Sequence, residues 1–146
     1  MRLLSLFCFV LVWGCFAIAK PREPSFSLDV GLKKDEVLVA SIASTKHPQN
    51  PTSAHKRFTL RWTLYRNEGL VVLVRYDHYP YQFILYRQYA MDSWKLNLLD
   101  SAGVQRDLNQ PELVIRFLGI DNPFNDEKTV AHLRIYGTGD VSFSRE

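Results

Sequence analysis

Hydrophobic and polar residues alternate with a period of two along most of the chain. The segment RFTLRWTL, residues 57–64, is the clearest case, because every second residue is apolar and the residues between are arginine or threonine. A half-buried β-strand has this pattern, whereas an α-helix would scatter the apolar positions around its axis. The pattern predicts a strand with Trp62 on its buried side.

Similar short runs, rich in β-branched and aromatic residues, recur along the chain. Besides residues 57–64, the candidate strands are residues 25–32, 36–43, 69–76, 81–89, 94–100, 112–119, 129–136 and 140–145. No stretch shows a convincing helical period. Eight or nine short antiparallel strands predict one all-β domain, a β-sandwich, with a small β-barrel as the alternative.

Turn-forming residues separate these candidate strands. The NEG segment, residues 67–69, predicts a three-residue hairpin loop with its glycine in the left-handed conformation. The DHYP segment, residues 77–80, predicts a four-residue loop. With these loops, Val74 would lie between Trp62 and Phe83 on the inner side of a three-stranded meander.

The other side of this meander differs from an ordinary polar surface. It is predicted to carry Arg61, Tyr65, Leu73, Arg75, Ile84 and Tyr86. Tyrosine and arginine beside aliphatic residues are typical of protein interfaces. These six residues are therefore our predicted partner-binding site, with Arg87 at or beyond its rim. The alternative is that residues 20–24 or 44–56 of the same chain cover this side.

The N-terminal segment predicts export. Arg2 precedes an almost unbroken apolar run over residues 3–16, and the small-x-small sequence AIA follows at residues 17–19. This pattern predicts a signal peptide over residues 1–19, a single domain over residues 20–146, and a periplasmic or extracellular location. One alternative is a lipid anchor at Cys15, and an uncleaved signal anchor is another.

Composition excludes several classes of function. The net charge is only +3 and is dispersed, which disfavours a nucleic-acid surface. Both cysteines, Cys8 and Cys15, lie in the predicted signal peptide. The mature domain is therefore expected to be cysteine-free, without disulfides or thiolate metal sites.

Few residues indicate catalysis. His78 follows Asp77, but neighbouring residues of a turn seldom form an oriented acid–base pair, so a hydrolase with a dispersed site there is the least favoured hypothesis. His132 is interpreted as a surface residue on the polar side of its strand. No G-x-S-x-G motif is present in the sequence.

A small-ligand module is the alternative to a protein-binding domain. Tyr79, Tyr81 and Trp94 could stack on a glycan, and the acidic loop over residues 121–127 offers oxygen donors for Ca²⁺, although its spacing differs from an EF-hand. No other cofactor is predicted. The favoured function is an exported, non-enzymatic protein that binds another macromolecule, most simply a protein of the envelope or of a secretion or surface-assembly system.

Overall fold

The computed structural model describes residues 23–44, 55–88, 90–98, 111–125, 127–139 and 141–146. Over these residues the chain forms nine β-strands and no helix. The strands are β1 (Phe26–Lys33), β2 (Leu38–Ser44), β3 (Lys56–Arg66), β4 (Gly69–Tyr76), β5 (Tyr79–Tyr86), β6 (Ser93–Asn97), β7 (Glu112–Asp121), β8 (Val130–Thr138) and β9 (Val141–Arg145). The all-β prediction is confirmed.

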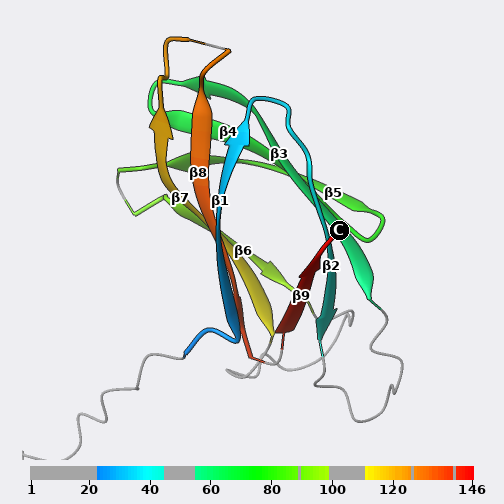
Figure 1. The fold of residues 1–146 in the computed structure, drawn as a ribbon. Coiled ribbons are helices and arrows are strands. Elements are labelled where there is room, and N and C mark those ends of the chain that lie inside the picture. The colour runs from blue at the N-terminus through cyan, green and yellow to red at the C-terminus, as the bar shows by residue number, and fades with distance from the viewer. Residues whose placement is uncertain (1–22, 45–54, 89, 99–110, 126, 140) are drawn as a thin grey trace, which may run out of the picture.

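The strands form two antiparallel sheets (Figure 1). One has four strands in the order β1-β8-β7-β6, and the other has five in the order β5-β4-β3-β2-β9. Buried side chains of both sheets form one hydrophobic cluster. Two sheets around a common core are consistent with the β-sandwich predicted from the sequence.

The core between the sheets follows the two-residue period. In β3, Phe58, Leu60 and Trp62 are at most 1% exposed, and in β8, Leu133 and Ile135 are fully buried. Complete burial of such a side chain contributes about 1.5–3 kcal/mol relative to leaving it in water. The prediction that Trp62 belongs to the core is confirmed.

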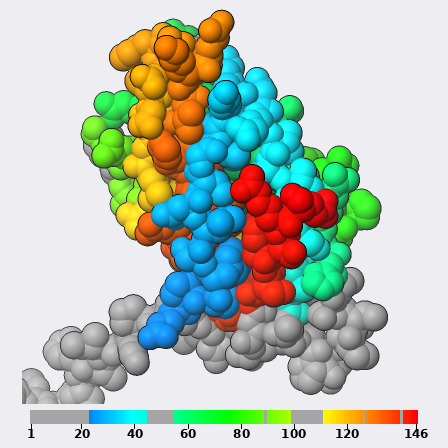
Figure 2. Space-filling view, viewed as in Figure 1, coloured from blue at the N-terminus to red at the C-terminus, as the bar shows by residue number. Residues whose placement is uncertain are grey.

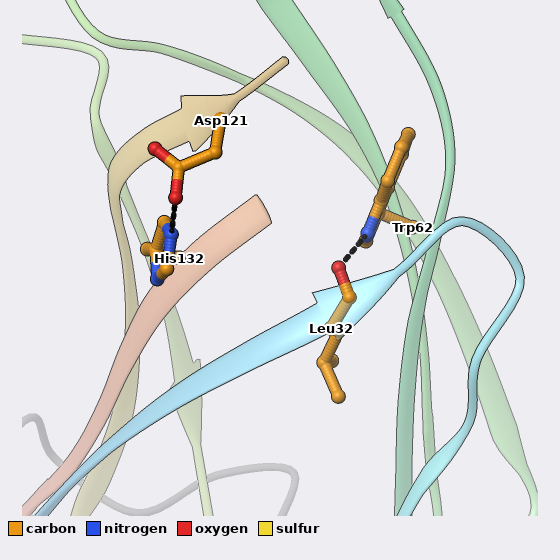
Figure 3. Close-up of polar contacts among 4 residues, drawn as sticks. All are labelled: Leu32, Trp62, Asp121 and His132. Atoms are coloured by element: carbon orange, nitrogen blue, oxygen red, sulfur yellow. Dashed lines mark hydrogen bonds and ion pairs between the residues drawn. The ribbon is translucent and has the colours of Figure 1, made fainter. Parts of the chain in front are cut away.

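Trp62 also holds the connection between the two sheets (Figure 3). Its indole Nε1 donates a buried hydrogen bond of 2.8 Å to the carbonyl oxygen of Leu32, near the end of β1. Its own carbonyl accepts a hydrogen bond of 2.9 Å from the backbone N–H of Asp35. Between Leu32 and Asp35 the chain leaves the four-stranded sheet and turns toward β2 of the other sheet. One core residue thus fixes where this crossover begins.

Aromatic stacking closes the two open sides of the core. Phe26 of β1 stacks on Phe143 of β9 with ring centroids 5.1 Å apart, and Phe83 of β5 stacks on Trp94 of β6 at 4.2 Å. Figure 2 shows β1 beside β9 on the surface. No strand pairing joins the two sheets in the described part of the chain, and these ring contacts help to close both sides of the core.

The first hairpin has a shorter loop than the sequence predicts. Arg66 pairs with Gly69, so the loop consists of Asn67 and Glu68 alone. These two residues have positive φ angles of 50° and 63°, as in the turns that two-residue hairpin loops favour. The prediction of a three-residue loop with Gly69 in the left-handed conformation is therefore wrong.

The second hairpin is also tighter, because Tyr76 pairs with Tyr79 and only residues 77–78 form its loop. The predicted four-residue loop is wrong. As a result Val72, instead of Val74, lies between Trp62 and Phe83. This is a shift of two residues, and an even shift leaves each side chain on its predicted side of the sheet.

The predicted signal peptide and Cys15 lie outside the described residues, as do residues 99–110. Within the described ranges, no helix has the length and apolar character needed to cross a membrane.

Candidate functional site

The predicted site lies on the side of the five-stranded sheet that faces away from the core. Arg61 of β3 pairs with Leu73 of β4, and Leu73 pairs with Gln82 of β5. We call this side the outer face and define it by seven residues: Arg57, Arg61, Leu64, Leu73, Arg75, Ile84 and Tyr86. Five of the six predicted site residues therefore share one face.

Tyr65 is the exception. A β-bulge shifts the register of β3 after Trp62, so that Leu64 lies on the outer face with 48% of its surface exposed. Tyr65 instead packs against the core, with its ring centroid 6.2 Å from that of Phe117. The prediction that Tyr65 faces outward is wrong, because the extra residue of a bulge exchanges the two sides of a strand. Leu64 takes its place.

Tyr86 lies flat against the sheet over a glycine. A Cβ atom added to Gly69 would be 2.8 Å from Cε1 of Tyr86 and 3.0 Å from Cγ2 of Ile84. The space left by the missing side chain is thus filled by the tyrosine ring, which is partly buried as a result. An aromatic ring that covers a strand glycine protects the backbone and broadens the apolar surface.

An aliphatic row crosses the outer face beside this ring. Leu64 pairs with Val71, and Val71 pairs with Ile84. Ile84 is 47% exposed, much like Leu64. Among the described residues, none lies over this row in a way that buries it. The segments predicted as an alternative cover, residues 20–24 and 44–56, fall mostly outside the described ranges.

Three arginines gather at the other end of the outer face. Arg75 of β4 pairs with Thr59 of β3. Arg57 and Arg61 lie two residues before and two residues after Thr59, so both are diagonal to Arg75. Side chains at such diagonal positions are about 7–8 Å apart, within the reach of arginine. Over the described part of the chain, none of these three guanidinium groups forms an ion pair with a carboxylate. Sequence reasoning placed Arg57 on this side by alternation but left it out of the site.

The β5 edge of this sheet is poorly suited to adding another strand. The backbone N–H of Tyr86 points away from β4 and donates a hydrogen bond of 2.9 Å to the carbonyl of Met91. Alternate residues of a strand point the same way, so Pro80, which has no N–H, lies on the same edge. Proline and an occupied N–H protect an edge strand from pairing. The outer face is therefore a more accessible surface than the edge.

The surface of the four-stranded sheet, in contrast, pairs its charges. Arg134 binds both carboxylate oxygens of Asp29, at 2.7 Å and 2.8 Å. Arg116 donates a hydrogen bond of 2.7 Å to Asp92. The arginines of the two sheets therefore differ in their partners. Arg134 and Arg116 form ion pairs with aspartates of the same chain, whereas the three arginines of the outer face form none with the described residues.

The Asp29–Arg134 pair gives a testable pH effect. Hydrogen bonds from Arg134 hold the pKa of the Asp29 carboxyl below its ordinary value. A carboxyl whose pKa is lower in the folded state stabilises the protein above its unfolded pKa, and this contribution is lost as the pH falls through the folded pKa. An NMR titration should give Asp29 a midpoint below that of an unperturbed aspartate, and Arg134→Gln should raise it. Equal midpoints in both proteins would contradict the pairing.

Asp77 and His78, the residues of the least favoured hypothesis, form a turn between β4 and β5. His78 lies 3.4 Å from Asp77, and its side chain is 88% exposed. Asp77 also lies 3.8 Å from Nζ of Lys56. The interpretation of residues 77–78 as a turn is confirmed.

The structure brings together two of the three proposed glycan-stacking residues, since the ring centroids of Tyr81 and Trp94 are 5.4 Å apart. Trp94 is partly buried and stacks on Phe83, while Tyr79 is 64% exposed at the far end of β5. In the 121–127 loop, the Thr129 hydroxyl lies 2.8 Å and 2.5 Å from the carbonyl oxygens of Asn122 and Asn125. Over the described residues, no group of three or more His, Cys, Asp or Glu side chains could hold a metal ion. Ca²⁺ and glycan binding stay predictions.

Two residues appear in a setting that the sequence did not indicate. Arg87 lies away from the arginines of the outer face and lines a hollow on the four-stranded sheet together with His132. His132 lies on the outward side of β8, as expected, but Nε2 of its ring also contacts Oδ2 of Asp121 at 2.8 Å (Figure 3). A second bulge, in β7, shifts the register beside this pair, which strict alternation does not predict.

The outer face therefore combines an apolar half, around Leu64 and Ile84, with a cationic half formed by three arginines. The chain matches no protein-family model, no curated protein and no solved structure.

Proposed function

We propose that this chain is an exported, non-enzymatic β-sandwich protein that binds another protein through its outer face. The partner class that we favour is a protein of the cell envelope or of a secretion or surface-assembly system. One observation carries the proposal: a half-exposed aliphatic row adjoins three arginines that have no carboxylate partner among the described residues.

The aliphatic row supplies the centre of the contact. Leu64 and Ile84 each expose roughly half of their surface, so their full burial against a partner contributes about 1 kcal/mol each. Tyr86 adds a ring already held against the sheet by Gly69. Because this ring is ordered before binding, little conformational entropy is lost when it is covered.

The arginines determine what the partner must offer. Like charges on neighbouring strands destabilise a sheet, and acidic groups of a partner relieve this repulsion. Guanidinium groups bind carboxylates through two parallel hydrogen bonds, which also orient the partner. The complementary surface therefore has an apolar centre and carboxylates on one side, and its association weakens as salt concentration rises.

The proposed location follows from the N-terminal segment. Residues 1–19 have the pattern of a signal peptide, so the partner is one met in the periplasm or outside the cell. Attachment to the envelope through a lipid at Cys15 is the alternative and leaves the outer face accessible. A nucleic-acid partner is disfavoured by export and by the small net charge of +3.

Photo-cross-linking tests the proposal directly in the cells that produce the protein. A benzoylphenylalanine in place of Ile84 lies on the outer face, and the same residue in place of Tyr136 lies on the surface of the four-stranded sheet. We expect one discrete adduct with another protein from position 84 and none of that mass from position 136. The same adduct from both positions, or none from position 84, would count against the proposal.

A further inference from the structure

The surface of the four-stranded sheet contains a hollow that the proposed function does not use. Its volume is about 500 Å³, and β1, β7 and β8 form its floor. Arg87, from the connection that follows β5, lines it as well. The hollow therefore lies where residues from both halves of the domain meet, on the side of the molecule away from the outer face.

Two strand glycines lie in the floor of the hollow, and the space above one of them, Gly119, is open. Gly31 of β1 and Gly119 of β7 flank His132, with which both are paired. A Cβ added to Gly119 would meet nothing within 4 Å, and its φ angle is not positive. Neither backbone conformation nor packing therefore requires glycine there, although glycine in a strand weakens it. A glycine in a strand often marks a bulge or a place where a ligand approaches the backbone closely.

A β-bulge shapes the same part of the hollow. The register between β7 and β8 shifts between Phe117 and Gly119, and the extra residue, Leu118, lines the hollow together with Ile120. Bulges often redirect side chains beside binding sites. Here the bulge turns Gly119 outward next to His132 and supplies an apolar wall.

The imidazole of His132 is oriented by Asp121 (Figure 3). Nε2 of His132 lies 2.8 Å from Oδ2 of Asp121, so with neutral histidine this nitrogen donates the hydrogen bond. The other nitrogen, Nδ1, is then an acceptor, and it lies 3.5 Å from the position that a Cβ of Gly31 would occupy. A hydroxyl group that enters above Gly31 meets this acceptor.

Arg87 is a cationic residue of the hollow that can pair with an anionic ligand. Both oxygens of Asp29, the other acid of the hollow, are bound by Arg134, and Asp121 binds His132. Arg87 forms no ion pair with any residue that the structure describes. An anionic ligand group can therefore bind Arg87 without displacing an existing partner.

We infer that this hollow binds a small hydroxylated carboxylate. Its carboxylate pairs with Arg87, a hydroxyl donates to Nδ1 of His132, and its carbon skeleton rests on Leu118 above the glycine floor. Open-chain hydroxy acids and uronic sugars share this chemistry. The inference is independent of the proposed protein partner, since no residue of the outer face takes part.

The test is a titration of ¹⁵N-labelled protein, followed by NMR, with three probes: galacturonate, glycerate and galactose. We expect one of the two acids, and not neutral galactose, to shift the amide signals of Gly31 and Gly119. The acid with the lower Kd shows whether the ligand belongs to the uronic sugars, as galacturonate does, or to the open-chain hydroxy acids, as glycerate does. No shift at these amides with either acid, or an equal response to galactose, would overturn the inference.

Three variants sharpen this test. Arg87→Gln should raise the Kd at least tenfold. Gly119→Val should abolish binding without lowering the unfolding temperature, because its side chain enters empty space. Arg61→Gln, on the outer face, is the matched control and should bind as the wild type does. A wild-type Kd for Arg87→Gln or for Gly119→Val would overturn the assignment.

Discussion

Replacing Trp62 with alanine is expected to lower the free energy of unfolding by about 3–5 kcal/mol. The side chain is 1% exposed and belongs to the core cluster, so its removal leaves a large cavity and takes away the donor to Leu32. Domains of this size are commonly stable by only about 5–15 kcal/mol. Equilibrium urea denaturation, followed by far-UV circular dichroism, measures the change.

Trp62→Phe separates the two contributions of the indole. Phenylalanine keeps most of the buried ring but leaves the carbonyl of Leu32 without its donor, which costs about 1–3 kcal/mol. Trp94→Phe is the control, because Trp94 is only partly buried and its contact with Phe83 is a ring stack that phenylalanine can retain. Equal stability of Trp62→Phe and wild type would show that the hydrogen bond does not hold the crossover.

The two-residue period of the sequence is sufficient to predict the strands and the core. Alternation depends on burial of one side of each strand, and that requirement acts on local sequence. Trp62 and Phe83 were assigned to the inner side on this basis, and both pack there. The order of strands in the sheets depends on contacts between distant residues, and no local pattern encodes it.

The prediction for the first hairpin loop is wrong because a glycine beside a turn can serve either of two roles, a left-handed backbone conformation or room for a neighbouring side chain. Gly69 suggested a left-handed loop position, but its role is to leave room for the ring of Tyr86. The positive φ angles fall on Asn67 and Glu68 instead. Glutamate rarely adopts a positive φ angle, so its presence does not predict a two-residue loop. The packing of Tyr86 over Gly69, which involves two different strands, explains the glycine instead.

The two β-bulges are the reason why some site residues could not be predicted from the sequence. Strict alternation placed Tyr65 on the outer face, and the bulge after Trp62 exchanged it for Leu64. The second bulge placed Gly119 beside His132. No glycine or proline marks the first bulge. The adjacent apolar residues Leu64 and Tyr65 do break the alternation there, but the sequence alone does not show which of the two faces outward. Arg61, Leu73, Arg75, Ile84 and Tyr86 were placed correctly on one side.

Loss of the aliphatic row is expected to have the largest effect on function. Leu64→Asp combined with Ile84→Asp should weaken binding of the partner at least 100-fold, or about 2.7 kcal/mol. The reason is that two carboxylates would be buried in the apolar centre of the contact, next to the acidic groups that we propose for the partner. Both side chains are roughly half exposed and lie outside the core, so the variant should fold. Titration calorimetry with the cross-linked partner, once identified, measures the Kd.

The Kd of this double variant, set beside a matched control, tests the role of the outer face most directly. The control is Val37→Asp with Phe124→Asp, which introduces the same charges at exposed apolar residues of two turns, 49% and 101% exposed. We predict that the control keeps the wild-type Kd, whereas the row variant loses at least 100-fold at an unchanged unfolding temperature. A row variant that is folded and binds within threefold of wild type would contradict the assignment of the outer face.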